Sequence, residues 1–146
     1  MSNSVFVKKL HPLAKMAKAT EGSAAYDLCY CETGSVVLRP GMTHAFETGL
    51  ALEMDSSKVA LVCSRSGLAL KYGVSVLNAP GIVDSDFRGE IKVILHNVSK
   101  NNFFVNPGDR IAQLMFQDVP AVQIAFKDEL GETDRGEGGF GSTGIK

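Results

Sequence analysis

Short apolar segments, rich in β-branched residues and separated by glycine, proline or asparagine, follow one another along almost the whole chain. They are SVFVKKL, YDLCYC, SVVLRPG, HAFETGLALEM, KVALVCS, GVSVLN, GEIKVILHNV, NFFVNPG, DRIAQLMFQDV and VQIAFKD. Their regular spacing is typical of an all-β barrel or sandwich. In GEIKVILHN, Ile91, Val93 and Leu95 alternate with mostly polar residues, as in a strand with one buried face. The only helical candidate is SGLALKYG, which is long enough for one or two turns.

Length, composition and charge limit the domain count and the classes of partner. A chain of 146 residues, 45% of them hydrophobic, is long enough for one domain with a buried core. A net charge of −1 without a basic stripe gives no support to nucleic-acid binding. No apolar run approaches the length of a membrane span, and the N-terminus lacks the apolar core of a signal peptide. We therefore expect a soluble, cytoplasmic protein with no membrane partner.

The three cysteines, Cys29, Cys31 and Cys63, are an odd number, which suits a reducing compartment. Cys29 and Cys31 would share one face of an extended segment, as a pair of metal ligands can. The chain has no second such pair, and its three histidines are scattered. We predict that Cys29 and Cys31 are small core residues rather than metal ligands.

The chain ends in RGEGGFGSTGIK, in which the dinucleotide pattern G-x-G-x-x-G occurs twice. That pattern binds a pyrophosphate when it opens a helix, and here only a few residues follow it. The Walker pattern fails because Ser142 stands where a lysine is needed. Two interpretations stay open: a disordered terminus, or a segment whose glycine N–H groups, hydroxyls and arginine converge on an anion.

Three further segments hold more polar residues and glycine than packing needs. In SRSGLA, Arg65, Ser66 and Gly67 offer a charge, a hydroxyl and backbone donors at the start of a helix; the alternatives are an anion site or an ordinary N-cap with a solvated arginine. The segment NAPGIVDSDFRGE is predicted to form a hairpin, entered through Pro80 and Gly81.

The hairpin and the last predicted strand each contain polar residues with two interpretations. Asp84 and Asp86 near the hairpin tip are either solvated turn residues or include a general base for a water. In DRIAQLMFQ, alternation places Gln113 on one face with Ile111 and Met115, where its amide needs hydrogen-bond partners. It would bridge chains or contact a polar ligand.

Together these segments resemble the trimeric dUTP pyrophosphatase (dUTPase) family. The resemblance rests on AAYDL, SRSGLA, NAPGIVDSDFRGE, GDRIAQLMF and RGEGGFGSTG, which occur in the family's order and cover nearly the whole chain. It implies a jelly-roll-like β-barrel over residues 1–134 and a glycine-rich, flexible C-terminal arm over 135–146. It also implies a homotrimer with active sites at its interfaces, the barrel loops, the hairpin and the arm of each site coming from three different chains. The implied reaction is Mg²⁺-dependent hydrolysis of dUTP to dUMP and pyrophosphate.

The resemblance assigns roles residue by residue. Asp84 would activate the water that attacks the α-phosphorus. The phosphates would be held by Arg65, Ser66, Gly67 and Gln113, and the uracil and sugar by Asn78, Gly81, Ile82, Val83 and Phe87, with Lys92 completing the substrate-binding set in the barrel. In the arm, Phe140 would stack on the uracil, and Arg135, Gly141, Ser142 and Thr143 would close on the phosphates. Asp27 would lie near Mg²⁺ through water, the direct ligands being phosphate oxygens.

The chain departs from the family pattern at three positions: Ser64 replaces the usual proline, Ala25 a glycine and Phe87 a tyrosine. Two rival functions share the fold. A dCTP deaminase would carry a glutamate and an arginine at the positions of Ile94 and Leu70. Without that glutamate, this chain has no proton shuttle for deamination. A non-catalytic nucleotide sensor would not require Asp84 together with the complete arm.

Overall fold

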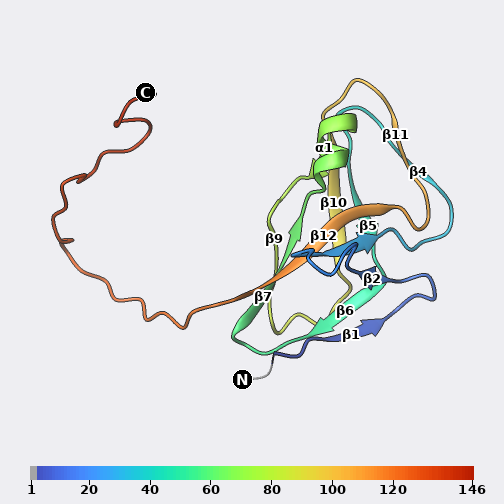
Figure 1. Cartoon of the computed structure of the whole chain (residues 1–146), viewed down its shortest axis with the longest axis horizontal. Coiled ribbons are helices and arrows are strands. Elements are labelled where there is room, and N and C mark those ends of the chain that lie inside the picture. The colour runs from blue at the N-terminus through green and yellow to red at the C-terminus, as the bar shows by residue number, and fades with distance from the viewer. Residues whose placement is uncertain (1–2) are drawn as a thin grey trace.

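The structure, a computed structural model, describes residues 3–146 and builds them almost entirely from short strands (Figure 1). The elements are β1 (Phe6–Lys9), β2 (Met16–Ala17), β3 (Tyr26–Cys29), β4 (Val36–Leu38), β5 (Thr43–Glu47), β6 (Leu50–Glu53), β7 (Lys58–Cys63), α1 (Ser66–Tyr72), β8 (Val74–Val76), β9 (Gly81–Val83), β10 (Lys92–Asn97), β11 (Phe103–Val105) and β12 (Arg110–Asp118). The all-β prediction is confirmed, as is the single short helix predicted in SGLALKYG. Among these residues no helix is long and apolar enough to cross a membrane.

The strands pair antiparallel in small sheets that wrap around one core as a jelly-roll-like barrel. The largest sheet has the order β2-β3-β12-β7-β9, and a second has the order β5-β10-β8. β1 pairs with β6, and β4 with β11. Strands adjacent in a sheet are often distant in sequence, so each sheet brings together loops from separate parts of the chain.

The core is apolar and takes one face of most strands. Ile91, Val93 and Leu95 are all buried, so the alternation predicted for this segment is confirmed. Phe46 is fully buried, and its ring lies edge-on to that of Tyr30 with centroids 5.4 Å apart. Cys29 and Cys31 are buried among these residues, as predicted for small core side chains. Burial raises the pKa of the Cys31 thiol to about 11.

A β-bulge in β12 changes the predicted face of one residue. The register of β12 against β3 shifts between Arg110 and Ala112, because one strand carries an extra residue there. Ile111 is consequently part of the buried core, whereas Gln113 is half-buried and lies outside it. The prediction that Gln113 shares a face with Ile111 is therefore wrong.

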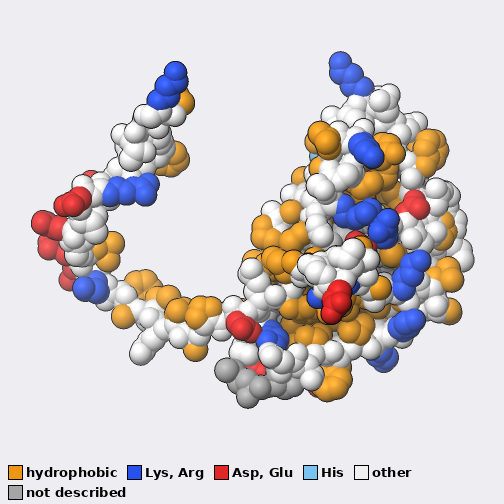
Figure 2. All heavy atoms as spheres, viewed as in Figure 1, with side chains coloured by type: hydrophobic (Ala, Val, Ile, Leu, Met, Phe, Trp, Pro, Cys, Tyr) orange, Lys and Arg blue, Asp and Glu red, His pale blue; other side chains and the backbone are white. Residues whose placement is uncertain are grey.

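Beyond β12 the chain leaves the barrel. The Val119 N–H donates to the Ser57 carbonyl at 2.6 Å, and residues 120–146 then form no strand or helix and extend away from the body (Figures 1 and 2). The strand predicted for VQIAFKD is not formed, since it has no partner strand in a single chain. Its alternating apolar side chains Val122, Ile124 and Phe126 are 71, 76 and 99% exposed. The extended part thus begins before the twelve residues predicted as the arm.

Candidate functional site

Three side chains form a row across the central strands of the large sheet, at the end of β7. Gln113 of β12 lies opposite Asp27 of β3 on one side and opposite Cys63 of β7 on the other. Directly opposed residues of antiparallel strands project from the same face. β7 ends at Cys63, so the loop that leads into α1 begins beside Gln113 and Asp27.

The loop before α1 is held by hydrogen bonds that do not use its first-turn donors. Gln113 Nε2 donates to the Ser64 carbonyl at 2.9 Å, and Arg65 Nη1 donates to the Arg110 carbonyl at 2.9 Å. Arg65 occupies the N-cap position, where no side chain caps the helix. Ser66 and Gly67 are exposed, so their N–H groups and the Ser66 hydroxyl face solvent. The alternative of an ordinary side-chain N-cap is contradicted.

Two arginines share one carboxylate in this loop region. Asp27 Oδ1 lies 3.8 Å from Arg65 Nε, and Asp27 Oδ2 lies 3.4 Å from Arg110 Nη1. The Asp27 side chain is 18% exposed, while that of Arg110 is 54% exposed. The arginine of SRSGLA is therefore paired rather than solvated. The loop combines free donors with two cations, a composition that attracts an anion such as a phosphate.

Arg110 was not predicted as a site residue. It follows Gly108 and Asp109 at the start of β12, and alternation alone marks it only as a solvent-facing strand residue. Arg110 lies beside Asp27 because β12 pairs with β3, and these two strands are far apart in the chain. The one sequence signal was its place in GDRIAQLMF, three residues before Gln113.

The predicted hairpin is a loop between two sheets. β9 pairs with β7, with Gly81 opposite Val62, whereas β10 pairs with β5 and β8. The prediction of a hairpin built from Asn78 to Glu90 is therefore wrong. Its entry is nevertheless compact: a Cβ on Gly81 would lie 3.2 Å from Asn78 Nδ2 and 3.2 Å from Val62 Cβ. A larger residue at position 81 would push Asn78 or Val62 away by a few tenths of an ångström.

A hollow of about 230 Å³ lies between the two ends of this loop. Five predicted site residues line it together with Glu90 and Ile91: Ile82, Val83, Asp84, Phe87 and Lys92. Asp84 is exposed, so its carboxylate is accessible from solvent. Its carbonyl accepts the Phe87 N–H at 3.2 Å, and the resulting turn presents Asp84 and Phe87 to the same hollow.

The phenylalanine ring rests on a glycine. A Cβ placed on Gly89 would lie 3.0 Å from Phe87 Cε2 and 2.6 Å from Phe87 Cζ, and the second distance is shorter than real Cβ atoms adopt. Gly89 thus supplies the flat surface against which the Phe87 ring packs. Phe87 as a whole is 45% exposed, and it lines the hollow.

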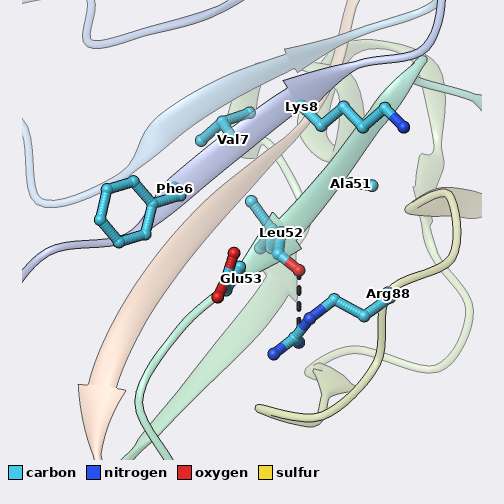
Figure 3. A pocket seen from close by; sticks show the side chains of 7 residues that line it. All are labelled: Phe6, Val7, Lys8, Ala51, Leu52, Glu53 and Arg88. Atoms are coloured by element: carbon cyan, nitrogen blue, oxygen red, sulfur yellow. Dashed lines mark hydrogen bonds between the residues drawn. The ribbon is translucent and has the colours of Figure 1, made fainter.

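The far end of this loop is anchored to the barrel at several points. Arg88 Nη1 donates to the Ser85 carbonyl at 2.6 Å and reaches the Leu52 carbonyl of β6 at 3.5 Å (Figure 3). Glu90 Oε2 accepts the Gly49 N–H at 2.9 Å, and the buried Thr48 hydroxyl donates to the Ile91 carbonyl at 2.6 Å. These bonds hold the carboxylate-bearing turn on a rigid base.

The predicted residues of the arm lie apart from the barrel and form local turns. Arg135 Nε donates to the Gly138 carbonyl at 2.8 Å, and Phe140 is fully exposed. Gly141 has φ 82° and Gly144 φ 88°, values that favour glycine. Arg135, Phe140, Gly141, Ser142 and Thr143 therefore share one short segment but contact no other predicted site residue in this chain.

The carboxylates of the described residues are not grouped as metal ligands. In residues 3–146 no three side chains of His, Cys, Asp or Glu come together as a metal-binding group. Asp27, the residue predicted to lie near Mg²⁺, already has two arginines within 4 Å. A single paired carboxylate fits contact with Mg²⁺ through water, with the direct oxygen ligands coming from a bound phosphate chain.

The fold and the site define an all-β protein that presents anion-binding groups at a strand–helix junction. Known proteins narrow this class. A family model described as dUTPase matches residues 12–144, and the chain belongs to the dUTPase family. It is similar to the deoxyuridine 5'-triphosphate nucleotidohydrolase of Neorickettsia sennetsu, with 48% identity over 88% of this chain and 86% of that protein. The enzyme of the same name from Syntrophotalea carbinolica is 44% identical over 97% of both chains.

Solved structures agree with the fold. A variant of the Staphylococcus bacteriophage 80alpha dUTPase with dUpNHpp has a TM-score of 0.85 and 25% identity, covering 99% of this chain and all of that one. A variant dUTPase from phage phi11 of S. aureus, whose structure describes the coordination of a structural Mg(II) ion, has a TM-score of 0.80 and 20% identity over 89% of this chain and all of that one. The second likeness shows the fold alone.

Proposed function

We propose that this chain hydrolyses dUTP to dUMP and pyrophosphate, lowering dUTP and supplying dUMP for thymidylate synthesis. The observation that carries the proposal is the uncapped loop of Arg65, Ser66 and Gly67, held by Gln113, in a chain whose relatives are named for this reaction. Asp84 is the general base: it accepts a proton from the water that attacks the α-phosphorus, and the pyrophosphate leaves on the opposite side.

The phosphate loop binds the triphosphate through donors whose charge suits the transition state. The Ser66 and Gly67 N–H groups and the Arg65 guanidinium donate to phosphate oxygens, on which charge increases as the bond to the leaving group breaks. Mg²⁺ bound to the triphosphate neutralises part of that charge. Asp27 orients Arg65 and Arg110 through its two ion pairs, and its carboxylate would contact such an ion through water.

The loop after β8 selects the nucleoside. Asn78 and the backbone from Gly81 to Asp84 pair with the uracil edge, in a slot that excludes a 5-methyl group. The close approach of Asn78 to Gly81 supports this placement of the Asn78 amide beside the backbone. Cytosine presents the reversed donor and acceptor pattern and would leave buried groups unpaired. Phe87 packs on the deoxyribose and excludes a 2′-hydroxyl. Lys92 adds a cation at the rim of the same hollow.

The strand register supports sites shared between copies of the chain. β9 runs antiparallel to β7 with Val83 opposite Ala60, so Asp84 is level with Val59. Five residues of strand separate Val59 from Ser64, or about 16 Å at the usual rise per residue. That gap is too long for one chain to place Asp84 at the α-phosphorus of a triphosphate held by its own phosphate loop. A homotrimer, in which the loop of one chain faces the hollow of another, removes this difficulty.

The segment after β12 supports association as well. The exposed alternation of Val122, Ile124 and Phe126 is that of a strand lacking a partner, which a second copy would supply. A half-apolar hollow of about 310 Å³ beside β1 and β6 is available on the barrel for such a contact (Figure 3). The last residues of the arm then reach a site on another copy, where Phe140 covers the uracil and Arg135, Gly141, Ser142 and Thr143 close on the phosphates.

The measurement that tests this function is pyrophosphate release from dUTP beside dCTP, dTTP and UTP, with Mg²⁺ and with chelator. We expect release from dUTP alone, and only with the metal. Release of ammonia from dCTP would instead indicate a deaminase, although Ile94 and Leu70 supply neither carboxylate nor guanidinium. Binding of dUTP without release would indicate a nucleotide sensor and would refute catalysis.

A further inference from the structure

Ser64 lies between β7 and the phosphate loop and accepts two hydrogen bonds, one from each of two sheets. Its backbone carbonyl accepts Gln113 Nε2–H at 2.9 Å. Its hydroxyl oxygen accepts the backbone N–H of Val76 at 2.9 Å. Ser64 is half-buried, and the next residue is Arg65, the first residue of the proposed phosphate grip. One residue thus joins the large sheet to β8 in the second sheet.

The N–H of Val76 needs this acceptor because β8 pairs on one side only. β8 lies at the edge of the sheet, next to β10, and Leu95 is opposite Val76. The Leu77 N–H donates to the Ile94 carbonyl at 2.9 Å, so the preceding N–H, that of Val76, points away from β10. Val76 is 4% exposed, which keeps water from replacing the partner. Without the hydroxyl, a buried donor would be left without an acceptor.

The bond connects two loops of one chain, which the proposed trimer would place in two neighbouring sites. Val76 is the last residue of β8, and Asn78, which packs against Gly81 in the nucleobase loop, follows two residues later. The Ser64 hydroxyl therefore links the start of the phosphate loop to the start of the nucleobase loop. We propose that Ser64 is a positioning residue, which sets the phosphate loop relative to Gln113 and β8 through its hydroxyl. This inference rests on the proposed function, because it assumes that the loop binds phosphate.

The proposal also accounts for a departure from the family pattern. A proline at this position, usual in the family, has no hydroxyl and fixes the loop by restricting its own φ. Serine leaves φ free, so the restraint here comes from the bond to Val76. The hydrogen bond from Val76 to Ser64 consequently restrains the loop in place of the proline ring.

The test compares a graded series at one position: Ser64→Thr keeps the hydroxyl, Ser64→Cys keeps a weak acceptor, and Ser64→Ala keeps none. Ser99→Ala is the matched control, because the Ser99 hydroxyl also accepts a backbone N–H, that of Asn101, in the turn after β10. Each full-length variant is assayed for dUTP turnover and for dUpNHpp binding by calorimetry, well below its melting temperature.

We expect Ser64→Ala to lose about tenfold in dUpNHpp affinity and in kcat/KM, Ser64→Cys to lose less, and Ser64→Thr and Ser99→Ala to stay near the parent chain. A purely structural role would lower the melting temperature of Ser64→Ala and leave the folded protein fully active, which would overturn the proposal. Equal losses in Ser64→Thr and Ser64→Ala would also overturn it. Binding does not require turnover, so a chain that binds dUpNHpp but hydrolyses no dUTP refutes the function while the Ser64 series is still decided. Should Ser64→Ala not fold, the Cys and Thr variants carry the comparison.

Discussion

Replacing Gly89 with alanine should weaken the discrimination between dUTP and UTP. The added methyl group would lie 2.6 Å from Phe87 Cζ, and ordinary contact begins at 3.4 Å, so the ring must withdraw by about 0.8 Å. Gly89 does not have a left-handed φ, and alanine is not strained by the backbone there. The ring is half-exposed and can turn, so it moves more easily than the backbone.

The magnitude follows from what the ring would exclude. Discrimination against one small group in a pocket is worth about 1–3 kcal/mol, and about 1.4 kcal/mol corresponds to tenfold. A ring displaced by most of an ångström should lose a large part of that contact. We expect the ratio of kcat/KM for dUTP to that for UTP to fall about tenfold, mainly through a gain with UTP.

The assay is pyrophosphate release from each nucleotide across a range of concentrations. Gly22→Ala is the control, because a Cβ at Gly22 meets no atom within 4 Å. An unchanged ratio in a folded Gly89→Ala variant would refute the argument that Gly89 seats the Phe87 ring. An equal loss with both nucleotides would show that the backbone moved in place of the ring, and would refute it as well.

Three other predictions concern catalysis, assembly and pH. Asp84→Asn should keep dUpNHpp affinity and lose turnover by about a hundredfold or more in stopped-flow assays; near-normal turnover would remove Asp84 as the base. Removing residues 135–146 should leave an assembled but nearly inactive protein by light scattering, whereas removing 120–146 should also abolish assembly; an active shorter chain would contradict the role of the arm. The pKa of Cys31 is about 11 in the folded state and about 9 in the unfolded chain. The free energy of unfolding should therefore fall by about 2 kcal/mol as pH rises between these values, because only the unfolded chain loses the proton there. Cys31→Ala should flatten that decline in urea titrations, and an unchanged slope would contradict burial of the thiol.

The fold class could be predicted because its signals are local. The alternation through Ile91, Val93 and Leu95 depends only on a strand with one buried face, and the helix after Arg65 is terminated by Gly73 with φ 63°. The polar segments of the site were also visible in the sequence, since packing alone does not require them.

The parts that could not be predicted depend on long-range pairing. Nothing local indicates that β9 joins β7 in place of β10, so the segment from Asn78 to Glu90 was interpreted as a hairpin. The bulge at Ile111 depends on how β12 fits against β3, and it changed the face assigned to Gln113. Arg110 and the Ser64–Val76 hydrogen bond were missed for the same reason, because each partner lies on another sheet or a distant strand.

If the last residues of the chain bind as proposed, the extended segment that follows β12 makes them a tethered ligand. The fifteen residues from 120 to 134 would span about 20 Å as a flexible linker, judged from the square-root dependence on length. Such a linker presents its end at an effective concentration in the millimolar range. A contact by residues 135–146 with a dissociation constant below the millimolar range would therefore be largely occupied in an assembled protein, while a free peptide of that sequence would need millimolar amounts to replace it.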